Sequence, residues 1–467
     1  MNRIQNYKNP QKTKILVLKS KEKPLHHLLS LLSDNKIDVP MVKPLKTVTS
    51  FQDSLRATLI IGQIFSLIPV VGVFSDIASD VKFMKKSWKC VYSLLSLIGQ
   101  MFMAVLCIHR LAKSTVSLNG TSPVIFYVTT CVTMMLFFQV ARRWPELVHH
   151  IARTENMDPS FDCSLTRKCN ITCAIVLILA LIEHILSLLA AFAGASACFT
   201  NAETYEGFVK YFYPWVFNCL PYSIMLGILT QFLHFQSTFI WNFSDLFVIC
   251  MSYYLTSRLE QVNKKLLAAQ GKYLPEVFWR ATREDYCRAT QLVRKVDDVI
   301  NGVVFISFAN NLFFICLQLF NTLEDGLKGT GNCPSKTKKA GPLGGHEAAT
   351  YFLFSLVYLL SRSVAVSLIA SHVNSATSVP APVLYDIPSP VYCTEVQRFL
   401  DQVNGDKVAL SGLQFFSVTR GLLLTVAGTI VTYELVMFQF NSSTPTLNIT
   451  APTVPPLIIN DTATSTT

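Results

Sequence analysis

The stretch ITCAIVLILALIEHILSLLAAFAGASAC, at positions 171–198, decides the class of fold. Glu183 and His184 are its only acidic or basic side chains, and it exceeds the roughly 20 apolar residues that a membrane-spanning helix needs. Six further runs have this character: 90–112, 122–142, 214–242, 301–323, 350–372 and 417–440. The sequence therefore predicts an all-α membrane protein with seven transmembrane helices.

The composition supports this class. The chain has 467 residues, of which 51% are apolar and 15% charged, and its mean hydropathy is +0.39. Soluble domains carry about 25% charged residues. The net charge of +11 comes from the N-terminal tail and from residues beside the apolar runs, so we expect no nucleic-acid partner. No constellation of metal ligands or of a nucleophile with its base is evident, and we expect no metal, no cofactor and no enzyme activity.

Two signals orient the spans. Lys and Arg gather before the first run, between the second and third, and between the fourth and fifth, which places these connections in the cytoplasm. Glycosylation sequons at Asn119, Asn441, Asn448 and Asn460 indicate exposure outside the cell. Both signals agree on a cytoplasmic N-terminus and an extracellular C-terminus. The sequon at Asn242 then lies at a cytoplasmic helix end and is expected to stay unused.

An eighth apolar run, 55–74, is interrupted by Pro69 and is expected to enter and leave on one side. The predicted organisation is a cytoplasmic tail (1–54), a re-entrant or interfacial segment (55–81), spans one to four (82–242), a cytoplasmic helical extension or anchor region (243–298), spans five and six (299–372) with an outer loop (324–348), a cytoplasmic linker with an amphipathic helix (373–414), a pore-lining span (415–440) and an extracellular tail (441–467).

The last span carries a polar stripe. Thr425, Thr429, Thr432, Val436 and Gln439 fall on one face of a helix. Such a stripe fits a water-lined path to which each subunit around a symmetry axis contributes one helix, and a ring of Phe440 side chains could close it by dewetting. Gly and Thr also mediate tight packing between helices, and spacing alone leaves both interpretations open.

The end of this span resembles a family motif. Thr432-Tyr433, five residues and then Gln439-Phe440 are similar to the C-terminal motif of insect gustatory receptors, and Glu434-Leu435-Val436 resembles the sugar-receptor branch. The likeness extends upstream and covers about residues 55–440.

This resemblance implies a sugar-gated, non-selective cation channel of the plasma membrane that acts in sweet taste. It implies a fold similar to the insect odorant co-receptor and a homotetramer around a central pore, or a heteromer with related subunits. The implied partners are a mono- or disaccharide and membrane lipid. The sequence does not name the sugar.

A sugar site needs hydroxyl-binding groups and aromatic faces, and ionisable groups within spans usually face a cavity or each other. The candidates in the outer half are Glu183, His184, Tyr222, Asn311, Gln318, Asn321, Asp325, Tyr351 and Arg362. A structural Glu–Arg or Glu–His pair, and plain hydrogen bonding of the amides between helices, remain open alternatives. Cys198 and Cys333 both lie outside in this topology, and spacing does not decide whether they pair.

Two other classes of protein have similar numbers of spans. A G-protein-coupled receptor has an extracellular N-terminus, and its Asp-Arg-Tyr and Asn-Pro-x-x-Tyr motifs are missing here. A sugar transporter is disfavoured because no internal repeat is visible.

Overall fold

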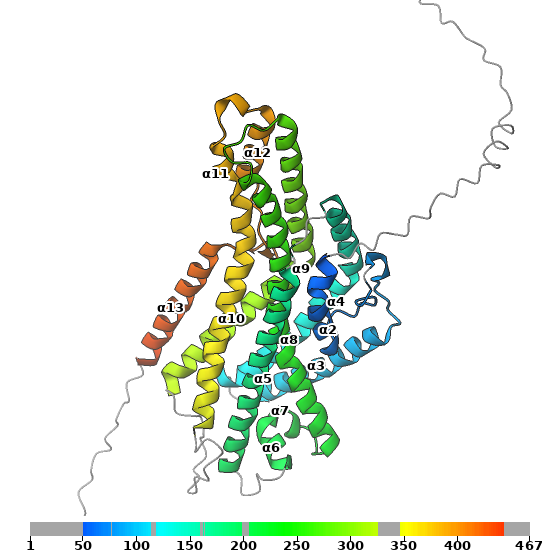
Figure 1. Ribbon diagram of the computed structural model, residues 1–467. Helices are drawn as coiled ribbons and strands as arrows, with labels where there is room; N and C mark the ends of the chain where they lie inside the picture. Colours follow the sequence, from blue (N-terminus) through cyan, green and yellow to red (C-terminus); the bar gives the residue numbers. More distant parts are fainter. Residues whose placement is uncertain are drawn as a thin grey trace, which may run out of the picture. The chain divides into compact units, whose positions relative to one another are not determined.

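A computed structural model describes residues 50–75, 77–113, 118–158, 162, 164–198, 205–325 and 346–442. The chain divides into Met1–Lys46 and Thr47–Thr467, and every described residue belongs to the second unit. Almost all of the described backbone is helical (Figure 1).

In the described part of the chain the bundle has seven long helices: α3 (Trp88–Lys113), α4 (Leu118–Met157), α5 (Leu165–Cys198), α8 (Ile224–Leu267), α9 (Glu276–Asp325), α10 (Glu347–Ser378) and α13 (Arg420–Ser442). Five of them, α3, α4, α5, α9 and α10, are long and apolar enough to cross a membrane. The other two reach spanning length, because 44 residues in α8 and 23 in α13 give about 66 and 35 Å of helix at 1.5 Å per residue.

Helix α8 is the centre of the bundle. It packs against α5, α9 and α10, and its side chains from Asn242 to Leu255 are almost all buried. Helix α9, with 50 residues, is about 75 Å long. Both helices therefore continue well beyond a hydrocarbon layer about 30 Å thick.

Helix α12 (Thr394–Gly405) packs against α9, α10 and α11 (Pro380–Tyr385). Arg283 Nε of α9 donates to Glu395 Oε2 of α12 at 2.9 Å. This hydrogen bond is the main reason why the pKa of Glu395 lies below its ordinary value of 4.5. The ion pair thus fastens α12 to α9.

Helix α2 (Ser50–Ile64) lies within the bundle. Its Phe51, Leu55 and Leu59 recur at the spacing of one helical face and are at most 4% exposed. At Gly62 an added Cβ would lie 2.6 Å from the ring of Phe243, so the missing side chain lets α2 approach α8 closely. After α2 the chain is irregular, apart from the 3-10 turn η1 (Ala78–Asp80), until α3 begins.

Two segments differ from the expectations drawn from the sequence. The run 214–242 is not one helix, because α7 (Pro214–Phe217) ends before a non-helical stretch and α8 begins at Ile224. Pro221 explains the break, since proline lacks an N–H and restricts the residue before it. The expected linker from 373 is largely helical: α10 runs to Ser378, and Pro380 opens α11, where a missing N–H has no cost.

A short hairpin connects α12 to α13. Strand β1 (Ser411–Gly412) pairs antiparallel with β2 (Phe416–Ser417), and a second 3-10 turn, η2 (Ser389–Val391), precedes α12. Leu413 and Gln414 adopt φ values of 48° and 62°, as the two central residues of a tight hairpin turn do. Asp297 of α9 accepts from the Ser411 N–H and hydroxyl at 2.7 Å each, which holds the hairpin on α9.

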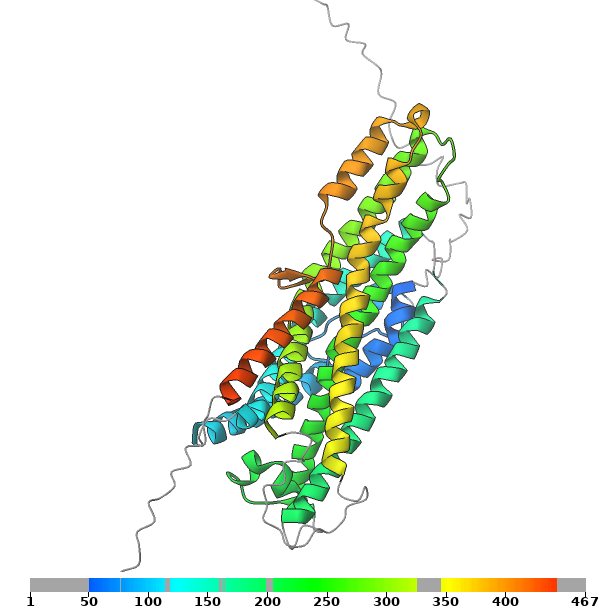
Figure 2. The same ribbon diagram turned by 90° about the vertical axis from the view of Figure 1, so that its left-hand side faces the viewer.

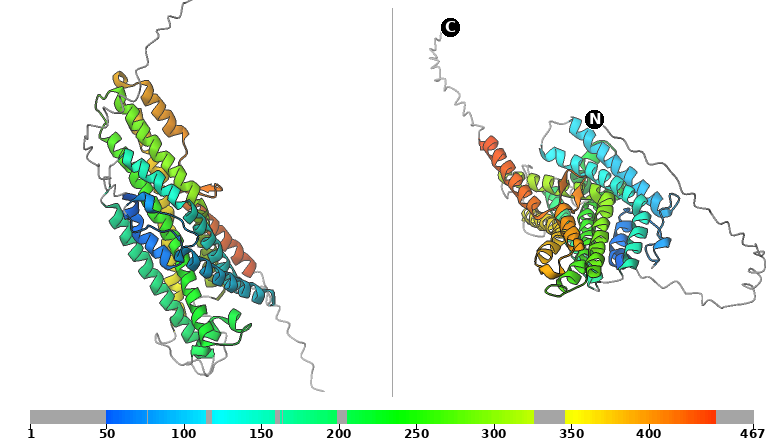
Figure 3. Two further views of the ribbon diagram at one scale, coloured as in Figure 1. Left: turned by 90° about the vertical axis from the view of Figure 1, so that its right-hand side faces the viewer. Right: turned by 90° about the horizontal axis from the view of Figure 1, so that it is seen from above.

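Helix α13 lies at the edge of the bundle, beside α9 and α10 (Figures 2 and 3). Leu422 and Ile430 face the bundle, whereas Thr425, Thr429, Thr432, Val436 and Gln439 are exposed. Each of the three threonine hydroxyls donates to the carbonyl four residues earlier, at 2.9–3.1 Å. Among the described residues, no neighbouring helix covers the three threonines of the polar stripe.

Candidate functional site

A cavity of about 460 Å³ lies between α4, α5, α8, α9 and α10, and it is capped by α6 (Tyr205–Phe212) and α7. Its volume falls in the range of small-molecule sites, about 300–1,000 Å³. Its principal lining residues are Phe126, Tyr127, Glu183, His184, Ser187, Tyr211, Phe212, Trp215, His234, Trp241, Phe314, Gln318, Asn321, Tyr351 and Ser355.

One wall of the cavity is a hydrogen-bonded chain across three helices. Gln318 Nε2 of α9 donates to Ser355 Oγ of α10 at 3.0 Å, and Ser355 Oγ donates to Glu183 Oε1 of α5 at 2.6 Å. Ser355 is 2% exposed, so it fixes the Glu183 carboxylate beside the cavity. This wall offers amide and carboxylate groups of the kind that bind hydroxyls.

Another part of the lining is aromatic. The rings of Trp241 and Phe314 lie 4.7 Å apart between centroids. His234 Nδ1 lies 3.0 Å from the hydroxyl of Tyr127, and the Phe212 ring lies edge-on to His234 at 5.3 Å. Flat apolar faces with polar edges suit a ligand that has C–H surfaces and hydroxyls together.

Some polar atoms on cavity-lining residues lack a hydrogen bond. Within the described part of the chain, Trp215 Nε1, Trp241 Nε1 and Asn321 Oδ1 are buried and have no partner. An unsatisfied buried group costs about 1–3 kcal/mol. Because these atoms are enclosed by protein, a ligand reaches them only if the wall moves. A hydroxylated ligand could therefore favour a rearranged wall over the observed one.

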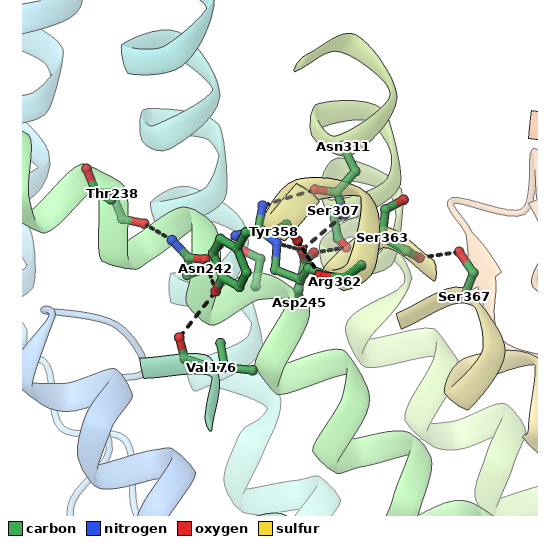
Figure 4. A network of polar contacts seen from close by, with 12 residues as sticks. Val176, Thr238, Asn242, Asp245, Ser307, Asn311, Tyr358, Arg362, Ser363 and Ser367 are labelled. Carbon is green, nitrogen blue, oxygen red and sulfur yellow. Dashed lines mark hydrogen bonds and ion pairs between the residues drawn. The ribbon is translucent and has the colours of Figure 1, made fainter. Parts of the chain in front are cut away.

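Beside the cavity residue Trp241, a buried ion pair joins α8 to α10 (Figure 4). Arg362 Nε lies 2.8 Å from Asp245 Oδ2, and the two side chains are 3% and 1% exposed. Asp245 also accepts from Ser307 Oγ and, at 3.0 Å, from Asn311 Nδ2, both on α9. The charges are thus compensated by an ion pair and by hydrogen bonds, as burial requires.

The same arginine reaches the cavity wall. Arg362 donates to Asn242 Oδ1, which also accepts from the Tyr358 hydroxyl at 2.8 Å. The Arg362 guanidinium lies 4.7 Å from the centre of the Trp241 ring, a cation–π contact. Trp241 therefore has one surface on the cavity and another on the ionic network.

A hydrophobic cluster carries the contacts on to α13. Phe314, Ile315 and Leu359 form its core, and Trp241 and Ile430 both pack against it. Since Phe314 and Trp241 also line the cavity, a single set of packed side chains extends from the cavity to the last helix.

The structure brings five of the nine predicted ligand residues to the cavity: Glu183, His184, Gln318, Asn321 and Tyr351. Asn311 and Arg362 lie in the ionic network, where Arg362 pairs with Asp245. Tyr222 lies between α7 and α8, 5.7 Å from Lys210 Nζ, and is not among the lining residues. Asp325 ends α9, and its side chain is outside the described part.

The remaining predicted positions lie at helix ends or outside the described residues. Asn119 is in the first turn of α4, and Asn441 is in the last turn of α13. Cys198 ends α5, and the side chains of these three residues and of Phe440 are not described. Asn448, Asn460 and Cys333 lie outside the described residues.

Several residues of this region were not predicted from the sequence, among them Asp245, His234, Trp215 and Trp241. Asp245 and His234 had a detectable signal, because each is an ionisable residue within or beside an apolar run. The two tryptophans carried none, since an apolar span accommodates indole rings on any face.

The chain is similar to known receptors over most of its length. The family model described as trehalose receptor matches residues 41–448. Gustatory receptor 5a for trehalose from Drosophila melanogaster is 33% identical over 402 residues, which is 85% of this chain and 86% of the relative. The Drosophila gustatory receptor for sugar taste 64f is 33% identical over 397 residues, covering 84% of this chain and 81% of the relative.

Solved structures share the fold at low sequence identity. The insect olfactory receptor OR5 from Machilis hrabei superimposes with a TM-score of 0.56 at 14% identity, covering 83% of this chain and 98% of that receptor. The same receptor in complex with eugenol gives a TM-score of 0.54 at 13% identity. These structures show that the arrangement of helices is that of an insect olfactory receptor.

Proposed function

Because the chain belongs to the trehalose receptor family, we propose that it is a gustatory receptor of the plasma membrane that acts as a sugar-gated, non-selective cation channel. The relatives named for trehalose and for sugar taste support the ligand class. The cavity carries the proposal within this molecule, because it combines an aromatic wall with hydroxyl-binding groups on one enclosed surface.

The proposed ligand is an uncharged mono- or disaccharide. Trp241 and Phe314 supply faces for the C–H surface of a sugar ring, and Gln318 and Asn321 supply amides for its hydroxyls. Glu183, held by Ser355, would accept from two hydroxyls at once. A carboxylate of this kind disfavours anionic ligands and suits a neutral polyol.

The proposed topology has seven spans, α3, α4, α5, α8, α9, α10 and α13, with the N-terminus in the cytoplasm and the C-terminus outside. Clustered Lys and Arg at one end of the bundle support this orientation. The cavity then opens toward the outside, and the packing of α9 with α12 lies in the cytoplasm.

We propose a tetramer in which α13 lines the pore, as a homomer or with related subunits. Support comes from the exposed threonine stripe, because a water-lined path needs a polar face that its own subunit leaves uncovered. Among the described residues, no atom outside the adjoining turns of α13 lies within 4 Å of a Cβ added at Gly428, so α13 can also approach a neighbouring subunit closely.

Gating would follow from the cluster that contains Trp241 and Ile430. A sugar that moves the cavity wall to reach Trp241 Nε1 displaces packing against Phe314 and Ile315, and hence against α13. A ligand shifts an equilibrium only through a difference in affinity between the two states. The hydrogen bonds missing in the observed state would provide that difference.

The direct test is electrical. Expression of the full chain in oocytes, followed by voltage clamp with a panel of mono- and disaccharides, should give a cation current for at least one sugar. The control is Trp241→Ala at equal surface expression, in which the sugar response should fall at least tenfold. Absence of current with every sugar, for chains that bind sugar in detergent, would rule out a channel made by this chain alone.

Topology and class can be tested on the same cells. An epitope at the C-terminus should be accessible to antibody without permeabilisation, whereas an N-terminal epitope should not. The opposite result would favour a G-protein-coupled receptor. Uptake of labelled sugar without current would favour a transporter.

A further inference from the structure

Helix α6, which caps the cavity, contacts the bundle at two glycines. At Gly194 of α5 an added Cβ would lie 2.5 Å from the hydroxyl oxygen of Tyr211 and 3.0 Å from its Cζ. At Gly227 of α8 an added Cβ would lie 3.1 Å from Cε1 of Tyr205. Two tyrosine rings of α6 therefore lie against helix backbone that bears no side chain.

Only one of these two rings borders the cavity. Tyr211 is a lining residue, whereas Tyr205 is not, and the Tyr205 hydroxyl donates to Gln231 Oε1 at 3.2 Å on the outer side of α8. The Tyr211 ring is thus held between the backbone at Gly194 and the cavity space.

The wall of α5 beside this ring is made of small residues. Ser187, Ala190, Ala191 and Gly194 occur at i, i+3, i+4 and i+7, which is one face of a helix. The first three line the cavity, and Gly194 lies one turn further toward the cap. The space that the cavity occupies here exists because these side chains are small and because Tyr211 can lie back against Gly194.

We propose that Gly194 and Tyr211 set the size of the sugar that the cavity accepts. With glycine at 194 the Tyr211 ring withdraws against α5 and leaves room for a second sugar ring. A larger residue at 194 pushes the ring away from α5 and into the cavity, which leaves room for a monosaccharide. This inference rests on the proposed function, since it assumes that the cavity is the sugar site.

A side chain added at position 194 would clash with a side chain that can move. The atom that a Cβ at 194 would meet first is the end of the Tyr211 side chain, which can shift, so Gly194→Ala should fold. One extra methyl or methylene in a pocket changes discrimination between ligands by about 10- to 200-fold. We therefore expect the disaccharide Kd of Gly194→Ala to rise at least tenfold and the monosaccharide Kd to change less than about threefold.

The experiment measures binding of one monosaccharide and one disaccharide to the full chain purified in detergent, by ligand-induced thermal shift. Gly194→Ala should raise the ratio of the disaccharide Kd to the monosaccharide Kd. Gly194→Ala/Tyr211→Phe should bring the ratio back toward wild type, because phenylalanine lacks the hydroxyl that lies 2.5 Å from the added methyl. Gly227→Ala is the matched control, since it presses on α6 at a ring outside the cavity.

The outcomes separate the two claims. An unchanged Kd ratio in Gly194→Ala, or an equal change of the ratio in Gly227→Ala, would show that Gly194 and Tyr211 do not set the size of the accepted sugar. Either result would leave the proposed function as a sugar receptor intact. A wild-type chain that is folded and gives no shift with any sugar would contradict the proposed function itself.

Discussion

Replacing Arg362 by Met tests whether the ion pair with Asp245 holds α8 to α10. Met retains most of the length of the side chain but removes its charge and its contacts with Asp245, Asn242 and Asn311. Asp245 would then remain at 1% exposure with only the hydrogen bonds from Ser307 and Asn311. Removing one partner of a buried pair costs about 3–5 kcal/mol.

This loss converts into a measurable temperature shift. Unfolding entropy is about 2.1 cal/mol/K per residue, which for 467 residues gives about 1 kcal/mol/K. The expected decrease in Tm is therefore about 3–5 °C. It can be followed by heating the detergent-solubilised protein and measuring the surviving monodisperse fraction by size-exclusion chromatography.

Two further variants test whether the loss comes from the uncompensated charge of Asp245. Asp245→Asn/Arg362→Met should recover most of the stability, because no uncompensated charge remains and Asn still accepts from Ser307. Arg398→Met removes an arginine that is 65% exposed and pairs with Glu395, so its Tm should change by less than 1 °C, in line with the about 0–1 kcal/mol of surface pairs. If Arg362→Met melts like Arg398→Met, or if the double variant loses the sum of the single losses, the buried pair does not stabilise the bundle.

Three other predictions follow from separate contacts. Ser355→Ala removes the donor that fixes Glu183, and sugar affinity measured by thermal shift should fall about tenfold; an unchanged Kd would place the sugar elsewhere. Ile430→Ala should raise the sugar concentration for half-maximal current while leaving the Kd unchanged, because it loosens α13 from the cluster and leaves the cavity intact; a parallel loss of binding would contradict this. The lowered pKa of Glu395 means that its ion pair with Arg283 stabilises the fold above pH 4.5, and that this stabilisation is lost as the pH falls through the folded-state pKa. The Tm of Glu395→Gln should therefore depend less on pH below 4.5 than the Tm of wild type. Equal slopes of Tm against pH in the two proteins would refute this contribution.

The helices were predictable because the length of an apolar run is a local property. The run 171–198 became α5 (Leu165–Cys198), and the family inferred from Thr432–Phe440 is confirmed by the family model over residues 41–448. Breaks inside helices were harder, since Pro221 ends a run that hydropathy alone treats as continuous.

Pairing between distant segments could not be predicted in the same way. Arg362 was recognised as a costly intramembrane charge, but its partner Asp245 lies on another helix, and only the packing of α8 with α10 brings them together. The cavity could not be predicted for the same reason. Gln318 and Asn321 share a helical face that spacing reveals, whereas the cap formed by α6 and α7 depends on where the chain after α5 returns to the bundle.

If α13 lines a pore as proposed, its threonines have a consequence for ion selectivity. Each hydroxyl directs its hydrogen to the carbonyl four residues earlier, so its oxygen turns only lone pairs outward. Around the proposed axis, such oxygens would form electron-rich rings without a formal charge. These rings offer hydrated cations a weak outer coordination and offer anions no hydrogen to bind. In such a pore we expect sodium, potassium and calcium to permeate with similar ease, and we expect the hydroxyl dipoles to exclude chloride without a formal charge.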